Sequence, residues 1–211
     1  MLAHGDQKSC VRVWSTRRLR GSVHGTCLAD ARRMTSVKPR DFRTDELLST
    51  ENSAIVIIDV QPVRVASLAS MEKRALVQNV GALAQMAKKY RMPVVLSTVN
   101  AETGRNKPMI HQVTDALADV RVYDRTTRNA WEDTELFAAI EATGRKDLIV
   151  SALWTEVCLT FPTLSALRDG YEVDPVVEAC GSTSLAAHEA SRPSPTSRAS
   201  SSRSKGADAQ L

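Results

Sequence analysis

A carboxylate, a guanidinium and a cysteine each lie next to a short apolar run in the middle of this 211-residue chain. Asp59 ends one such run, Arg125 comes two residues after a second, and Cys158 follows a third. A thiol that loses its proton is a strong nucleophile toward a carbonyl carbon, and a nearby carboxylate can accept that proton. A guanidinium stays charged near neutral pH, so its role would be electrostatic. These three residue types predict a nucleophilic cysteine site.

The segment around Cys158 places the thiol at the start of a helix. The apolar run 147–153 is typical of a buried parallel strand, and the spacing after Thr155 is helical. Amides at a helix start and the positive end of the helix dipole favour an anion. We therefore expect this thiol to have a lowered pKa, and we expect Arg125 to lower it further.

The elements that must position these groups alternate regularly along the chain. Buried strands are expected at 54–59, 93–99, 120–123, 147–153 and 171–177. Helices are expected at 75–89, 110–117, 133–144, 158–169 and 182–190. This alternation predicts an α/β fold, a doubly wound parallel sheet in a Rossmann-like three-layer arrangement with helices on both faces. The carboxyl ends of its strands share one edge, so Asp59, Arg125 and Cys158 should meet there.

Composition divides the chain into three parts. Residues 1–41 hold nine Lys/Arg against three Asp and are predicted to be a disordered basic extension. A chain start at Met34, an organelle transit peptide and a nucleic-acid-binding arm are alternative interpretations of this part. Residues 42–190 are predicted to form the folded domain. Residues 191–211 contain seven Ser and four basic residues, which predicts a low-complexity Ser/Arg tail.

Several classes of protein are excluded by composition. No apolar run approaches 18 residues, so we expect no membrane span and no membrane partner. The formal net charge is +4, but residues 1–41 carry a surplus of six, so the domain has no basic footprint for nucleic acid. The four cysteines are irregularly spaced and form no CxxC motif, which argues against disulfides and zinc and favours a cytoplasmic location.

Three motifs together resemble the isochorismatase-like cysteine hydrolases. They are Asp59 after its buried strand, Asn129-Ala-Trp131 after a basic residue, and Thr155-Glu-Val-Cys158. The runs at 129–131, 155–158 and 161–167 are similar to the YcaC-like branch of this family. The resemblance extends over roughly residues 53–190. It implies a hydrolase that acts on a small amide or a related C–N or vinyl-ether substrate.

The resemblance also assigns roles to single residues. It implies that Cys158 is the nucleophile, that Asp59 is the general base, and that Arg125 occupies the third position, where the family commonly has Lys. It places the oxyanion-binding amides at Trp154 and Cys158, and a cis peptide bond between Leu153 and Trp154. We expect four further residues to contact the substrate: Asn129, Trp131, Thr155 and Gln61. Loop closure by Asn129 and core packing of Trp131 are alternatives.

Neither a cofactor nor a metal ion is expected. Some relatives carry an Asp-x-His metal site after the second strand, whereas the stretch here is Asn100-Ala-Glu-Thr, without histidine. The resemblance implies a small-molecule substrate and a homo-oligomer. Relatives continue beyond residue 190 with a further strand and helices, so this chain is expected to lack them.

The sequence leaves two other functions open. A catalytically impaired member of the family would act as a binding or assembly protein, and it would hold ligand without turnover. A thiol redox sensor would need a second cysteine near Cys158, and Cys180 is the candidate within the domain.

Overall fold

Five parallel strands form the centre of the protein in a computed structural model, which describes residues 47–191. The strands are β1 (Ser53–Ile58), β2 (Val94–Val99), β3 (Val122–Arg125), β4 (Asp147–Ala152) and β5 (Glu172–Pro175). Their order in the sheet is β3-β2-β1-β4-β5, and every neighbouring pair is parallel. The direction of winding reverses between β1 and β4, at the place where ligands bind in open α/β sheets.

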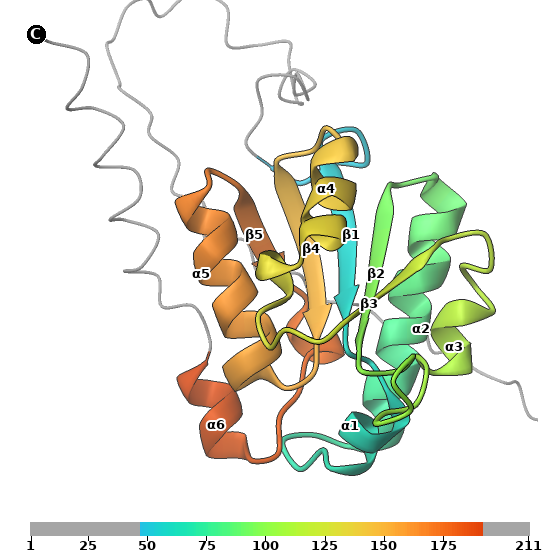
Figure 1. Cartoon of the computed structure of the whole chain (residues 1–211), viewed down its shortest axis with the longest axis vertical. Helices are drawn as coiled ribbons and strands as arrows, with labels where there is room; N and C mark the ends of the chain where they lie inside the picture. The colour runs from blue at the N-terminus through green and yellow to red at the C-terminus, as the bar shows by residue number, and fades with distance from the viewer. Residues whose placement is uncertain (1–46, 192–211) are drawn as a thin grey trace, which may run out of the picture.

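Helices cover both faces of this sheet (Figure 1). The helices are α1 (Pro62–Ala66), α2 (Lys73–Tyr90), α3 (His111–Thr114), α4 (Thr134–Ala142), α5 (Thr160–Arg168) and α6 (Leu185–Ala190). Helices α2 and α3 pack on one face, α4 and α5 on the other, and α1 lies beyond the carboxyl ends of the strands. The predicted doubly wound three-layer α/β fold is confirmed.

The central strand β1 contributes to both layers of the core because alternate side chains point to opposite faces. Ile55 and Ile57 join the aliphatic cluster under α2 and α3. Val56 and Ile58 join the second cluster, under α4 and α5, which also contains Cys158. All six residues of β1 are buried, as expected of a parallel strand covered on both sides.

Helix ends follow local signals in the sequence. Glu72 precedes α2, and its carboxylate accepts hydrogen bonds from the amides of Arg74 and Ala75. Asp133 accepts from the Leu136 amide at the start of α4, as predicted. Gly144 follows this helix with φ 66, a conformation that glycine adopts without a steric penalty.

Some boundaries differ from the sequence prediction. Strand β3 lies two residues later than predicted, because Asp124 inside it is satisfied by the amides of Ala101 and Glu102. The predicted strand at 120–123 left Asp124 in the following loop. Helix α1 was not predicted, although Pro62 at its first position is typical of a helix start. The predicted helix at 110–117 is shortened to α3.

The predicted extension at 1–41 and most of the predicted tail at 191–211 lie outside the described residues. The described sheet ends at β5, where Pro175 is tolerated because the strand is at the sheet edge. The expected lack of a further strand and helices stays a prediction. Between residues 47 and 191, no helix is long and apolar enough to cross a membrane.

Candidate active site

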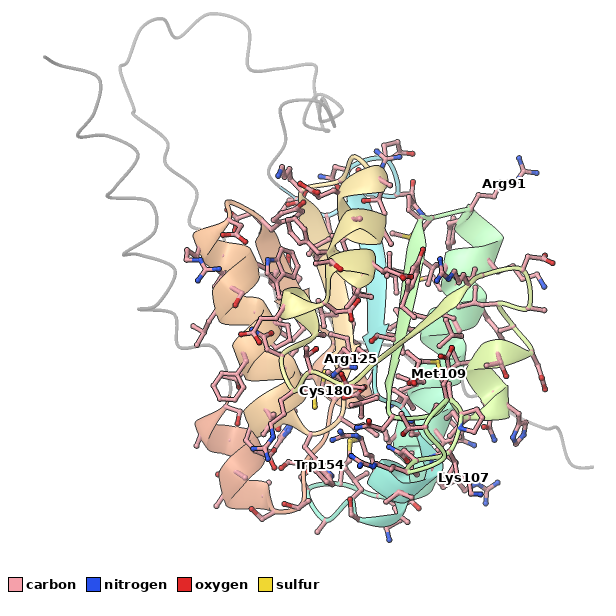
Figure 2. The ribbon with its side chains drawn as sticks, in the orientation of Figure 1. Arg91, Lys107, Met109, Arg125, Trp154 and Cys180 are labelled. Carbon is pink, nitrogen blue, oxygen red and sulfur yellow. The ribbon has the colours of Figure 1, made fainter. Side chains whose placement is uncertain are left out.

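The three predicted reactive groups come together where the winding of the sheet reverses. Asp59 directly follows β1, Arg125 ends β3, and Cys158 lies in the π-helical turn η2 (Thr155–Leu159) after β4. Figure 2 shows Arg125 and Trp154 at this end of the sheet. Asp59 is fully buried, and Arg125 and Cys158 are each 2% exposed, so water is largely excluded from the cluster.

Asp59 and Arg125 form a bidentate ion pair. Arg125 Nη1 donates to Asp59 Oδ1 over 2.6 Å, and Nη2 donates to Oδ2 over 2.8 Å. Arg125 Nη1 also donates to the Ser97 hydroxyl and the Thr98 carbonyl, both over 3.0 Å. Burial alone would lower the pKa of Arg125, but the hydrogen bonds and charge of Asp59 outweigh burial and raise it. Arg125 is thus held in its charged form.

The backbone of Asp59 adopts an unusual conformation. Its φ is 59°, in the left-handed region that residues other than glycine rarely occupy. Its amide donates to the Ser97 carbonyl of β2 over 2.9 Å, and its carbonyl accepts from the Gln61 amide. Such strained residues persist where the surrounding structure fixes them, and they are concentrated at functional sites.

Cys158 lies in a widened helical turn rather than in a regular one. The Thr160 amide donates to the Thr155 carbonyl, which is an i to i−5 bond. Pro162 has no amide hydrogen and cannot bond to the Cys158 carbonyl four residues earlier, so a regular helix cannot be completed here. The Asp59 carboxylate lies close enough to the Cys158 thiol that its charge raises the pKa of that thiol. The predicted nucleophile and the predicted base therefore lie side by side.

The predicted low pKa of Cys158 is wrong. Burial, followed by the negative charge of Asp59, raises the pKa of the thiol to about 12. The positive charges of Arg64 and Arg125 oppose this shift without reversing it. The sequence prediction considered the helix start and Arg125 but not the depth of burial, and the adjacent carboxylate stabilises the protonated thiol. Cys158 is therefore a neutral thiol at physiological pH.

The expected cis peptide bond lies between Leu153 and Trp154. The Trp154 amide that follows it donates to no acceptor within the described residues. The Cys158 amide, in contrast, donates to the Trp154 carbonyl over 2.7 Å. Of the two amides expected to bind an oxyanion, only that of Trp154 is without a partner in this structure.

Two of the residues expected to bind substrate support the backbone of the site. Gln61 is fully buried, and its amide group bonds to both backbone groups of Val99 and to the Lys107 carbonyl. Thr155 is buried, and its amide donates to the Gly181 carbonyl over 3.1 Å. Their hydrogen-bonding groups are directed to the protein, which favours a supporting role over substrate contact.

The other two residues of that set also have structural partners. Asn129 accepts from the Trp131 amide and donates to Ser165, so it closes the loop before α4. Trp131 is buried, its indole N–H donates to Asp169 over 2.8 Å, and its ring packs edge-on against Tyr171. The alternatives of loop closure and core packing are therefore favoured over substrate contact.

A second guanidinium, not predicted from the sequence, reaches the cluster. Arg64 of α1 lies 3.4 Å from Asp59 Oδ2, and its guanidinium stacks 4.3 Å from the centre of the Trp154 ring. The Trp154 indole N–H donates to the Ser67 hydroxyl over 2.8 Å. The sequence contains one signal for this contact, a basic residue five positions after Asp59. The signal is informative only if a helix begins at Pro62, because that helix turns Arg64 back toward Asp59.

No group of three or more potential metal-binding side chains occurs between residues 47 and 191. Both cysteines in this part of the chain are free thiols. Cys180 is 1% exposed, and its sulfur lies 3.6 Å from the Val150 carbonyl.

Residues 53–193 match the isochorismatase domain family, a span that includes the whole sheet and all three reactive groups. The chain belongs to the isochorismatase family. Its similarity to one member, the probable hydrolase YcaC of Escherichia coli, is 33% identity over 135 residues, which is 64% of each chain. The family and the YcaC-like resemblance predicted from the sequence are confirmed.

Solved structures of other isochorismatase-family proteins agree with this fold. The E. coli YcaC structure, described as an octameric hydrolase of unknown specificity, is 32% identical with a TM-score of 0.65, covering 68% of this chain and 71% of that one. YcaC from Pseudomonas aeruginosa, solved with hexane-2,5-diol and covalent acrylamide, is 28% identical with a TM-score of 0.67 and covers 78% of each chain. A Bacillus subtilis nicotinamidase, 16% identical with a TM-score of 0.55 over 66% of this chain and 92% of its own, shares the fold.

Proposed function

We propose that this protein hydrolyses a small amide, or a related C–N or vinyl-ether compound, through a covalent intermediate on Cys158. The observation that carries the proposal is the position of the buried Cys158 thiol within electrostatic range of Asp59, a carboxylate fixed by Arg125. Membership of the isochorismatase family and similarity to a probable hydrolase support the same reaction class. The covalent acrylamide in the Pseudomonas relative is consistent with a reactive site in this branch.

In the first half of the reaction with an amide, Asp59 accepts the thiol proton as the sulfur attacks the carbonyl carbon. A C–S bond forms, and the carbonyl oxygen becomes an oxyanion that the Trp154 amide can bind. Collapse of this intermediate breaks the C–N bond, and Asp59 returns the proton to the leaving amine. The product that stays on the enzyme is a thioester.

In the second half, water hydrolyses the thioester. Asp59 takes a proton from water as the water oxygen attacks the carbonyl carbon. Cleavage of the C–S bond releases the carboxylic acid, and the proton held by Asp59 returns to the sulfur. The thiol, the carboxylate and the ion pair are then in their starting states.

The high pKa of the resting thiol fits this cycle. The Asp59 carboxylate is held by Arg125 and lies beside the thiol, so the proton moves over a short path when the sulfur attacks. The net charge of the cluster does not change on this transfer, and the two guanidinium groups remain beside the developing thiolate. The nucleophile is thus generated only when an electrophile is in place.

The test is a screen of small amides by product release and intact-mass spectrometry. We expect a thioester adduct on Cys158 with at least one substrate, and we expect both adduct and turnover to disappear in Cys158→Ala. Turnover that survives in Cys158→Ala would contradict the proposal. Ligand binding by the wild type without any turnover would instead support the binding or assembly protein.

We also propose that the protein forms a homo-oligomer. The related E. coli protein is described as octameric. Three large apolar side chains on α5 and α6 are each about half exposed, which is unusual for adjacent elements: Phe161, Leu164 and Leu185.

Light scattering after size exclusion tests this proposal. The wild type should give a multiple of the 23.1 kDa chain mass. Leu164→Glu should reduce the measured mass, whereas Tyr90→Glu, at a similarly exposed site on α2, should not. A monomeric wild type would refute this.

A further inference from the structure

Arg64 is held firmly in place at the active site, although the proposed reaction uses only its charge. Its guanidinium stacks on the Trp154 ring at 4.3 Å, and that indole is in turn fixed by its hydrogen bond to Ser67 at the end of α1. Its Nη2 atom lies 3.4 Å from Asp59. Stacking and the ion pair together fix the orientation of this side chain, whose surface is 12% exposed.

Two nitrogen atoms of this guanidinium have no acceptor. Nε and Nη1 of Arg64 are both buried and make no hydrogen bond. A buried donor without a partner destabilises the folded protein by about 1–3 kcal/mol, and more when the group is charged. The Nε atom of Arg125, the other guanidinium paired with Asp59, is also buried and unbonded. Unused donors on two guanidinium groups therefore border the carboxylate that accepts the thiol proton.

Charge at the cluster is also unbalanced. Asp59 carries one negative charge, Arg64 and Arg125 each carry one positive charge, and the thiol of Cys158 is neutral. Arg125 has further negative charge nearby, from Asp124 and Asp133. Within the described chain the one ion pair of Arg64 is with Asp59, which already accepts two hydrogen bonds from Arg125. The excess positive charge is therefore located at Arg64.

We propose that Arg64 forms an anion-binding subsite beside the Cys158 thiol, so that the preferred substrates carry a carboxylate close to the bond that is cleaved. A carboxylate would accept hydrogen bonds from the unused donors of Arg64 and would neutralise the excess charge. This inference rests on the proposed function for its use in hydrolysis, but the binding subsite itself does not depend on turnover.

Alkylation of Cys158 with a matched pair of reagents tests the subsite without any turnover. Iodoacetate is an anion and iodoacetamide is its neutral amide, and both form the same C–S bond and release iodide. We would measure both rates at pH 7.5 and locate the modified cysteine by mass spectrometry. The ratio of the iodoacetate rate to the iodoacetamide rate at Cys158 should exceed the ratio for free cysteine by about tenfold or more.

Arg64→Gln should remove this preference. We expect both rates to fall, because the charge of Arg64 lowers the pKa of the Cys158 thiol, but the iodoacetate rate should fall about tenfold or more further than the iodoacetamide rate. Arg64→Lys, which keeps the charge but loses the guanidinium geometry, should keep part of the preference. Arg74→Gln is the matched control, because Arg74 is an exposed arginine on α2 and the same change of charge there should leave the ratio unaltered.

Three results would contradict the proposal of an anion-binding subsite. The first is a wild-type ratio no higher than that of free cysteine, and the second is an equal fall of both rates in Arg64→Gln. The third is a Cys158 that reacts with neither reagent. Rapid labelling of the buried Cys180 would reveal an unfolded Arg64→Gln protein, and the Arg64→Lys ratio then decides the question.

Hydrolysis assays separate this inference from the proposed function. Amides that carry a carboxylate should be cleaved faster than the corresponding methyl esters of that carboxylate, and Arg64→Gln should reduce the difference. If the reagent preference holds but no amide is cleaved, the subsite stands and the hydrolase proposal fails. If neutral and anionic amides are cleaved equally and the reagents show no preference, the hydrolase proposal stands and the subsite fails.

Discussion

Two cysteines are buried in the same layer of the core, and their surroundings differ in ways that matter for chemistry. Cys158 follows β4 in the turn η2, and Cys180 follows the short helix η3 (Val177–Ala179) after β5. Each is at most 2% exposed, and burial raises the pKa of each thiol to about 12. Judged by burial and pKa alone, the two thiols are equivalent.

Their neighbours are not equivalent. The thiol of Cys158 lies within electrostatic reach of the Asp59 carboxylate and of two guanidinium groups. The sulfur of Cys180 faces the Val150 carbonyl, a group that accepts a hydrogen bond but is not a useful base. The comparison predicts that the reactivity of Cys158 depends on a proton acceptor and on charges that can stabilise a thiolate, since burial by itself makes a thiol inert.

The largest expected effect separates the two cysteines directly. Cys158→Ala should lower amide hydrolysis by at least about a thousandfold, because the nucleophile is lost. Cys180→Ala should retain activity within a few fold and should lose about 1–2 kcal/mol of stability, since it removes a small buried group. Steady-state kinetics and urea unfolding measure the two effects. Similar activity losses in both variants would contradict the comparison.

Removal of Arg125 makes the surroundings of Cys158 more like those of Cys180. Arg125→Met should destabilise the protein by about 3–5 kcal/mol in urea unfolding, because Asp59 loses its bidentate partner in a buried site. Hydrolysis should fall by about a hundredfold or more as the base is no longer positioned.

Arg121→Met is the control for the loss of an ion pair. Its ion pair with Glu135 is exposed, so a loss below about 1 kcal/mol is expected. Equal losses in the two variants would refute the assigned role.

Gly181 connects the two regions, because it follows Cys180 and its carbonyl accepts from the Thr155 amide of η2. A Cβ atom at Gly181 would lie 2.3 Å from Leu68 Cδ1, so Gly181→Ala should cost about 1–3 kcal/mol and slow the alkylation of Cys158. Gly81→Ala is the matched control in α2. The nearest atom there is 3.6 Å away, and a gain of about 0.5–1 kcal/mol is expected. Stabilisation by Gly181→Ala would contradict the observed packing.

A further effect is a dependence of stability on pH that the two thiols should share. Unfolded thiols ionise near the reference pKa of 9.0, whereas the folded thiols keep their protons to about 12. Above pH 9 the folded protein therefore binds more protons, and its stability falls as pH rises, by at most about 1.4 kcal/mol per pH unit for each thiol. Urea unfolding between pH 8 and 11 should show a shallower decline in Cys158→Ala and in Cys180→Ala. An unchanged slope in the double variant would contradict the shared effect.

Much of the fold could be predicted because its signals are local. Apolar runs of about six residues, Asp133 before its helix and Gly144 after it specify β1, β4 and α4 without reference to distant residues. Strand β3 was misplaced because its polar Asp124 is satisfied by amides on the loop after β2. That compensation depends on packing between segments and leaves no local pattern.

The sequence alone determined the residue types at the ends of three strands, and with them the meeting of Asp59, Arg125 and Cys158. This followed because parallel strands share one carboxyl edge. Three features were decided by the tertiary structure alone. They are the raised pKa of the Cys158 thiol, the hydrogen bond from the Cys158 amide to the Trp154 carbonyl, and the position of Arg64 beside Asp59. The physical reason is that desolvation and hydrogen-bond satisfaction depend on what surrounds a group in three dimensions, whereas residue type and spacing are properties of the chain itself.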